Sequence, residues 1–226
     1  GTAVAKTPQP PVSPGLFSRL PDTALAKLSR QAIRGKSHAV KVNRELLRRQ
    51  HRLSVSLPGD ISIDVIRKQQ QDLGKGRSSW VGHASDDPES TVILGISGDA
   101  IAGSFHYRGK LFKLEPRADG SQVLSEVKAT APAPELDPIA ISVPASVADR
   151  VADISSGAPN LKVLGSAGAN GTGSELDVLV AYTPAVQALY GTEGAEALSV
   201  QAVAETNQAY SNSDMTTRLN LIGVYR

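Results

Sequence analysis

Residues 53–65 have the sequence Leu-Ser-Val-Ser-Leu-Pro-Gly-Asp-Ile-Ser-Ile-Asp-Val. Apolar residues occupy every second position on both sides of Pro58-Gly59-Asp60, a turn-forming triplet. Alternate side chains of a strand point to opposite faces of a sheet, so this pattern predicts a β-hairpin with one buried face. The hairpin sets the fold of the region that follows it.

The same kind of pattern continues to residue 127 in short segments separated by turn residues such as Gly98-Asp99 and Arg108-Gly109. The expected strands cover residues 80–83, 91–97, 101–107, 111–115 and 122–127. Short strands at this spacing predict an antiparallel meander, a sandwich or a partial barrel. Trp80, the one tryptophan of the chain, is expected to anchor the core of this sheet rather than to bind a ligand.

The residues before the hairpin follow a different pattern. Four prolines between residues 8 and 14 predict an extended tail. Good helix formers and the spacing of Leu25, Leu28 and Ile33 predict a short helix over residues 22–34, ended by Gly35. The pattern of residues 40–50 fits a strand or a helix equally well.

Residues 129–174 are rich in Ala, Pro, Ser and Gly, which predicts a long linker, with a brief helix at 147–154. Beyond it, the nearly continuous apolar run at 176–182 predicts a strand buried on both faces. An amphipathic helix is expected over 195–210 and a further strand over 217–225. Strand, helix and strand at this spacing predict one parallel crossover. The residues expected on the apolar face of the helix are Ala195, Leu198, Ala202, Val203, Thr206, Ala209 and Tyr210.

These segments predict an α+β chain in four parts. Residues 1–52 form an extended tail with short helices, 53–128 a β-rich antiparallel domain, 129–174 a linker with a processing region, and 175–226 the opening of an α/β domain. The 226 residues, of which 40% are hydrophobic, are enough to bury a core. No apolar run is long enough to span a bilayer, and the absence of cysteine excludes disulfides and thiolate sites.

Charge is distributed unevenly along the chain. Residues 1–77 carry 15 Lys and Arg against 5 Asp and Glu, whereas residues 78–226 carry 9 against 17. Three interpretations of the basic part remain open: a solvated face, a surface that docks on an acidic partner such as residues 175–226, and a nucleic-acid site. We rank nucleic-acid binding last because aromatic residues are nearly absent there. The basic run consists of Lys36, Lys41, Arg44, Arg48, Arg49 and Arg52.

Few residues offer catalytic or metal-binding chemistry. The four histidines show no His-Glu-x-x-His spacing, and the chain has no nucleophile elbow or phosphate-binding loop. Asp86, Asp87 and Glu89 near His83 could bind a hard cation or act in acid–base chemistry, but a solvated loop is the favoured interpretation. His106 is expected on the surface or in a cross-strand pair. We therefore assign no catalytic, cofactor-binding or metal-ligating residue to this chain.

Some stretches resemble a known family. Residues 175–184 (Glu-Leu-Asp-Val-Leu-Val-Ala-Tyr-Thr-Pro), 202–213 and 217–221 are similar to the first strand, first helix and second strand of secreted bacterial reprolysin-like zinc metalloproteases of the peptidyl-Asp metalloendopeptidase kind. Residues 79–82 and the Gly-x-Leu-Phe-x-Leu-x-Pro stretch at 109–116 resemble the β-rich propeptide of the same precursors. The likeness covers about 50 residues of the catalytic part.

The resemblance implies a metzincin-like catalytic domain in which a His-Glu-x-x-His helix and a third histidine bind zinc and the glutamate activates water. None of those residues is present here, so the parent polypeptide is expected to continue past Arg226. The resemblance thus implies a fragment of a secreted zymogen. In such a zymogen, the propeptide is expected to assist folding, to inhibit the protease and to contact its own catalytic domain. The parent contains zinc and hydrolyses peptide bonds. This fragment alone is expected to be inactive and to bind no zinc. The alternative is a secreted β-rich module that binds a partner without enzymatic activity. Neither alternative involves nucleic acid or a membrane.

Overall fold

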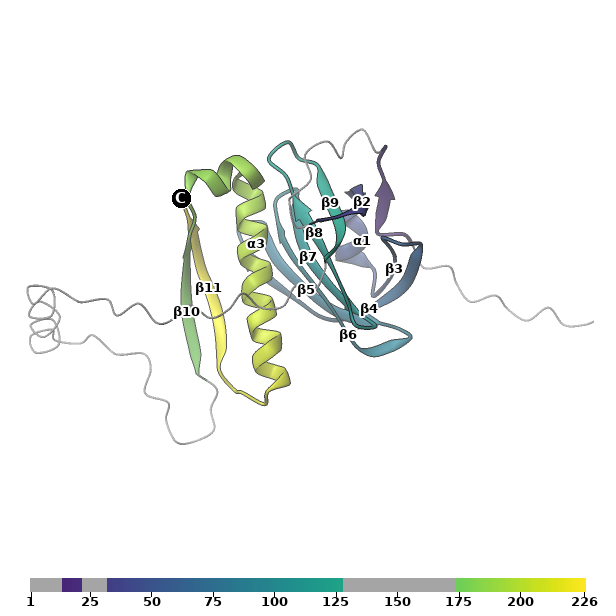
Figure 1. Cartoon of the computed structure of the whole chain (residues 1–226). Helices are drawn as coiled ribbons and strands as arrows, with labels where there is room; N and C mark the ends of the chain where they lie inside the picture. Colours follow the sequence, from purple (N-terminus) through teal and green to yellow (C-terminus); the bar gives the residue numbers. More distant parts are fainter. Residues whose placement is uncertain (1–13, 22–31, 128–173) are drawn as a thin grey trace, which may run out of the picture.

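The computed structural model describes residues 14–21, 32–127 and 174–226 of the chain (Figure 1). Within these residues, antiparallel strands form a curled sheet, and the C-terminal residues form a strand–helix–strand unit beside it. Residues 1–13 of the tail predicted at 1–15, most of the helix predicted at 22–34 and nearly all of the predicted linker, with its helix at 147–154, lie outside the described residues. No helix in the described part of the chain is long and apolar enough to cross a bilayer.

The large sheet has nine strands among the described residues, each antiparallel to its neighbours. Their order across the sheet is β1-β2-β9-β8-β7-β6-β5-β4-β3. The strands are β1 (Phe17–Arg19), β2 (Ala32–Val42), β3 (Arg52–Leu57), β4 (Ile61–Gly74), β5 (Arg77–Ala84), β6 (Asp87–Ser97), β7 (Ala100–Tyr107), β8 (Lys110–Pro116) and β9 (Gln122–Val127).

The residues just before β1 bring the two edges of this sheet together. The Leu16 amide donates a hydrogen bond to the Ser54 carbonyl (2.8 Å), and the Ser54 amide donates to the Pro14 carbonyl (2.9 Å). Because Ser54 lies in β3 and Phe17 in β1 pairs with Val42 in β2, the sheet becomes a nearly closed barrel. Of the three architectures predicted, the barrel is the one observed.

The core of the barrel contains large side chains that have no solvent-exposed surface of their own. Trp80, Phe105 and Phe112 are fully buried. Phe17 packs edge-on against Phe105, with ring centroids 6.0 Å apart. Leu47 of the short helix α1 (Arg44–Arg49) joins the same core. The prediction that Trp80 anchors the sheet is confirmed.

The predicted hairpins are also confirmed. Leu53 pairs with Val65 and Leu57 with Ile61, which is the register that the alternating pattern of 53–65 predicts. Between β7 and β8, Arg108 (φ 47°) and Gly109 (φ 74°) both have positive φ. Positive φ at both central residues is the requirement of the two-residue turn that best matches strand twist.

The C-terminal unit consists of β10 (Glu175–Ala181), α3 (Pro184–Asn212) and β11 (Arg218–Tyr225). The two strands are parallel, in register from Glu175–Arg218 to Ala181–Tyr225, which confirms the predicted crossover. The helix begins eleven residues earlier than residue 195, where the prediction placed it. Thr183 caps it, and Gly191 (φ 74°, ψ 174°) kinks it between a short first segment and the longer second one.

Three local predictions differ from the structure. Residues 32–34 belong to strand β2, not to a helix, because β2 pairs with β9 about ninety positions away and this pairing overrides local propensity. Residues 40–50 contain both alternatives, since β2 ends at Val42 and α1 spans 44–49. Strand β10 is not buried on both faces, and Leu179 is 58% exposed.

The predicted apolar face of the helix is only partly correct. Ala195 and Val203 are buried as expected, but Ala202 and Ala209 are exposed. Gln201 was expected on the polar face because its side chain is polar, but it is buried, with 6% of its surface exposed. The reason is that α3 packs against two layers, so that it has two buried sides instead of one.

Candidate functional site

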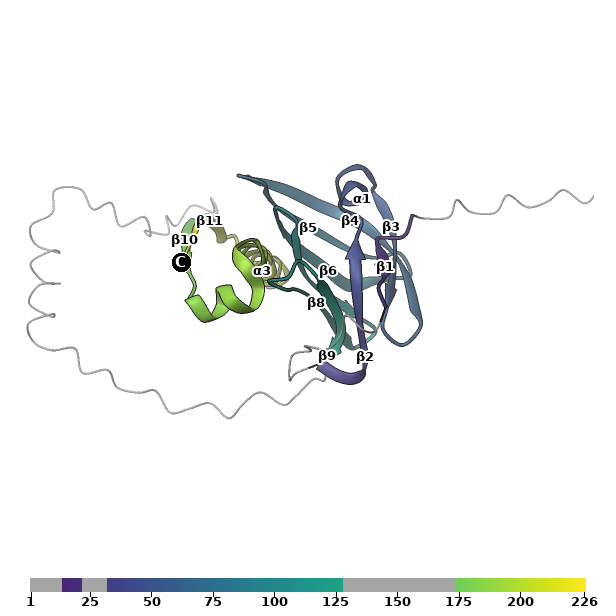
Figure 2. The same cartoon turned by 90° about the horizontal axis from the view of Figure 1, so that it is seen from above.

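Helix α3 lies between the barrel and the β10–β11 pair, as two perpendicular views show (Figures 1 and 2). On one side it contacts β5, β6, β7 and, more lightly, β8, and on the other it contacts β11. We call the barrel residues that meet it the docking surface. These residues are Val81, Ile93, Gly95, Ser97, Asp99 and Ser104.

The centre of the docking surface is Gly95 in β6. A β-carbon at this position would lie 2.2 Å from the Ala197 carbonyl oxygen and 2.4 Å from the Gln201 amide nitrogen of α3. Both are backbone atoms of the helix, so neither can rotate away. Glycine is therefore required here for the close approach of helix and sheet.

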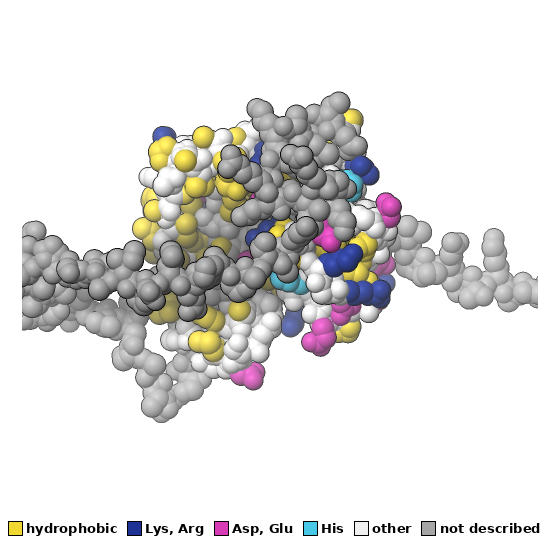
Figure 3. All heavy atoms as spheres, in the orientation of Figure 1, with side chains coloured by type: hydrophobic (Ala, Val, Ile, Leu, Met, Phe, Trp, Pro, Cys, Tyr) yellow, Lys and Arg dark blue, Asp and Glu magenta, His cyan; other side chains and the backbone are white. Residues whose placement is uncertain are grey.

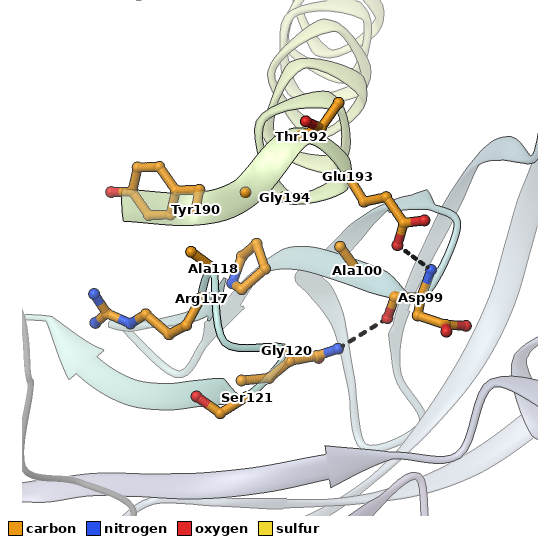
Figure 4. A pocket seen from close by; sticks show the side chains of 13 residues that line it. Asp99, Ala100, Arg117, Ala118, Gly120, Ser121, Tyr190, Thr192, Glu193 and Gly194 are labelled. Atoms are coloured by element: carbon orange, nitrogen blue, oxygen red, sulfur yellow. Dashed lines mark hydrogen bonds between the residues drawn. The ribbon is translucent and has the colours of Figure 1, made fainter. Parts of the chain in front are cut away.

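Three glutamates of α3 accept hydrogen bonds from the barrel. The Ser97 hydroxyl donates to Glu196 Oε2 (2.5 Å) and the Ser104 hydroxyl to Glu205 Oε1 (2.5 Å). Glu193 Oε2 accepts from the backbone amide of residue 99 at 2.8 Å, as the close view shows (Figure 4). Hydrogen bonds to charged acceptors contribute about 1.5–3 kcal/mol each when they are partly buried. The polar contacts thus hold the helix at both ends of the docking surface.

Apolar contacts flank these polar ones. Ala204 packs between Val81 and Ile93, which forms a small buried cluster. Further along, Leu73 of β4 packs against a second cluster that includes Val200 and belongs to α3 and β11. The apolar contact of barrel with helix is therefore modest in area, and small or polar residues make most of it.

Two cations of the basic run, Arg44 and Arg52, pair with carboxylates of the barrel and not with α3. Arg44 pairs with Asp99, and Arg52 lies 3.8 Å from Asp64. These cations therefore neutralise carboxylates of the barrel itself, although one of them, Asp99, belongs to the docking surface. At the interface, the glutamates of α3 accept hydrogen bonds from hydroxyl groups and a backbone amide of the barrel, and not from guanidinium groups.

A cavity of about 260 Å³ lies where the kink of α3 meets the barrel (Figure 4). It is bounded by the β6–β7 turn, the β8–β9 turn and residues 190–194 of the helix. In the wall of the cavity, the side-chain nitrogen Nε2 of Gln122 donates a hydrogen bond to the backbone carbonyl of Asp99 (3.3 Å). Burial raises the pKa of the Tyr190 hydroxyl, and the nearby carboxylate of Glu115 raises it further.

The acidic loop after β5 is tied to the next hairpin. Asp86 Oδ2 accepts hydrogen bonds from the Tyr107 hydroxyl (2.7 Å) and from Arg108 Nη2 (2.9 Å). The hydrogen bond to Asp86 raises the pKa of Tyr107. These contacts give Asp86 a structural role. The predicted loop is shorter than expected, because Asp87 and Glu89 already belong to strand β6, which pairs with β5 and β7.

The zinc ion implied by the family resemblance does not fit the residues present. His83 lies in β5 and the exposed His106 in β7, with the whole of β6 between them. Two strand spacings amount to about 10 Å, whereas zinc–nitrogen bonds are about 2.1 Å long. Within residues 14–21, 32–127 and 174–226, no three His, Asp or Glu side chains are grouped closely enough to hold a metal.

Exposed apolar side chains gather over the β10–β11 pair. Leu179 is 58% exposed and Ile222 51% exposed, although both lie in strands. In the space-filling view, hydrophobic side chains are concentrated on the side of the molecule where β10, β11 and α3 lie, and charged ones over the barrel (Figure 3). A parallel sheet is normally covered on both faces, and here one face of a two-stranded piece is open.

Comparison with known proteins relates this chain to three bacterial enzymes. A peptidyl-Asp metalloendopeptidase of Stenotrophomonas maltophilia is 31% identical over 179 residues, covering 71% of this chain and 39% of the relative. The enzyme of the same name from Xanthomonas campestris pv. campestris is 30% identical over 187 residues, covering 75% and 41%. That of a second S. maltophilia strain is 32% identical over 181 residues, covering 71% and 39%.

Over most of its length, the chain is similar to a part of the peptidyl-Asp metalloendopeptidases. It spans only about two fifths of the length of the metalloendopeptidases that it matches. No profile of a known protein family matches the sequence, and no solved structure matches it. Over the matched length, the comparison supports the resemblance that the sequence motifs indicated.

Sequence reasoning missed the docking contacts of this chain. Ser97 and Ser104 look like ordinary polar residues of strands, and only the sheet register places them on the face that meets α3. Gly95, inside a strand of apolar residues, was the one available signal. An isolated glycine in a strand often marks the close approach of another backbone.

Proposed function

We propose that this chain is the N-terminal part of a secreted zinc metalloendopeptidase zymogen. The barrel is the propeptide, the linker of residues 129–174 contains the processing region, and β10, α3 and β11 open a metzincin-like catalytic domain. The whole polypeptide hydrolyses peptide bonds with a zinc ion bound by residues outside this chain. This chain alone contributes folding assistance and inhibition, and no chemical step.

The observation that carries this proposal is the partial coverage of the relatives. The match extends over most of this chain but only 39–41% of proteins named for metalloendopeptidase activity. Among the described residues, no three His, Asp or Glu side chains are grouped closely enough to hold a metal, which fits a catalytic centre formed by other residues of such a protein. The open apolar face at Leu179 and Ile222 is where further layers of the catalytic domain would pack.

A comparison of two proteins tests the proposal. One is residues 1–226 as they stand, and the other is the polypeptide that the genomic reading frame encodes past Arg226. We expect chelator-sensitive peptide hydrolysis and stoichiometric zinc only in the longer protein. Chelator-sensitive hydrolysis by residues 1–226, or a stop codon directly after Arg226, would contradict the proposal.

The alternative of a partner-binding module without enzymatic activity is not favoured. The three relatives carry an enzyme name, and the barrel presents its docking surface to a helix of its own chain.

A further inference from the structure

We infer that the barrel and the β10–α3–β11 unit form a specific non-covalent complex that persists after the chain between residues 127 and 174 is cut. Helix α3 is the recognised element, and the docking surface is its receptor. The inference rests on the proposed function only in calling the barrel a propeptide. The association itself is a property of the contacts described here.

Each partner has core contacts of its own in addition to those at the interface. The barrel closes through residues 14–16 and encloses Trp80, Phe105 and Phe112 without help from α3. On its far side, α3 packs Val200 and Val203 against Leu221 of β11. A cut between the two bodies therefore leaves two units that keep their own packing.

The docking contacts specify one position of the helix. Glu196 and Glu205 are nine residues apart, so they are separated by about 13.5 Å along the helix axis. Their donors, Ser97 and Ser104, lie on adjacent strands. A helix shifted or rotated by one residue would lose both hydrogen bonds, and the backbone contact at Gly95 leaves no space for a different side chain at this crossing.

The interface has the character of a separable one. Its hydrogen bonds join hydroxyls and a backbone amide to carboxylates, and its apolar part is restricted to small clusters around Ala204 and Leu73. Interfaces of this composition occur between domains that associate and dissociate, whereas obligate ones are more hydrophobic. The complex is therefore expected to be specific and reversible.

The test uses the full chain with a site-specific protease sequence inserted near residue 150. After cleavage, size-exclusion chromatography and sedimentation over a series of concentrations report whether the two pieces remain together and with what Kd. We expect co-elution as a 1:1 complex. Complete separation of the wild-type pieces at all concentrations would overturn the inference.

Variants assign the association to the docking surface. Gly95→Ala is expected to separate the pieces, because its methyl group would overlap the helix backbone. Its matched control is Gly15→Ala, where a β-carbon would meet nothing within 4 Å. Circular dichroism and the fluorescence of Trp80 show whether each barrel is folded. An unchanged Kd for Gly95→Ala would contradict the assignment.

A double-mutant cycle decides the question even if Gly95→Ala fails to fold. Ser104→Ala and Glu205→Ala should each weaken association about tenfold, and the double variant little more, because both remove the same hydrogen bond. Ser56→Ala and Glu45→Ala, both exposed and away from α3, are the controls. Additive effects of the two interface substitutions would refute the recognition role of this pair.

The outcomes separate this inference from the proposed function. Association is measured without protease activity. If the pieces stay together but the longer polypeptide hydrolyses nothing, the proposed function fails and the complex stands. If the longer polypeptide is an active protease but the pieces separate, only the present inference fails.

Discussion

Gly82 in β5 is a position inside the barrel where one added methyl group should be costly. A β-carbon there would lie 2.3 Å from the Ile66 carbonyl oxygen of β4 and 2.6 Å from the Trp80 ring. Carbon atoms pack at about 3.5–4.0 Å, so the methyl group would be about 1 Å too close to the ring. The carbonyl is held in the sheet and the ring in the core, so neither has room to move.

Gly82→Ala should therefore lower the free energy of unfolding by about 3 kcal/mol, at the upper end of the usual cost of overpacking. For a domain of this size, each kcal/mol corresponds to about 4–8 °C, so we expect the Tm to fall by about 12–24 °C. Thermal unfolding followed by the fluorescence of Trp80 measures the shift, with Gly15→Ala as the control. A Tm equal to that of the control would show that the sheet yields at this point and would refute the steric reasoning.

Three other expectations concern the linker, the acidic loop and the core. Limited proteolysis should cut first within residues 129–174 and leave a resistant barrel, because small residues and proline there predict exposed backbone; early cuts within residues 91–115 would contradict it. Asp86→Asn should lower the pKa of Tyr107, because it removes the carboxylate that raises it, and an ultraviolet titration of variant against wild type measures the change. Phe105→Ala should cost about 3–5 kcal/mol in urea denaturation, because the ring is fully buried; a loss below 1 kcal/mol would show that the core collapses around the gap.

Local patterns predicted those parts of the fold whose partners are near in sequence. The hairpin at 53–65 is joined by a three-residue turn, so alternation and turn chemistry together determine its register. Strand β2 could not be predicted in this way. Its partner β9 lies about ninety residues later, and nothing in residues 32–42 identifies that partner.

The candidate site was less predictable than the fold, because it depends on which face of each element meets another. Gln201 is polar, yet it is buried and donates to Glu205 at 2.9 Å within the docked helix. One apolar stripe was expected on this helix, but a helix between two layers has two buried sides. The absence of a metal site, by contrast, was expected from the spacing of the histidines alone, and it stays a prediction.

The closure of the barrel has a consequence for the time course of folding. Strand β2 pairs with β9, so an early strand of the barrel has to wait for the last barrel strand to be synthesised. Contacts between residues so far apart in sequence form slowly, because a long loop must close before they contribute any stability. Strand β2 therefore has an unpaired edge until residue 127 has been synthesised, and a nascent chain halted before this point would be prone to aggregation.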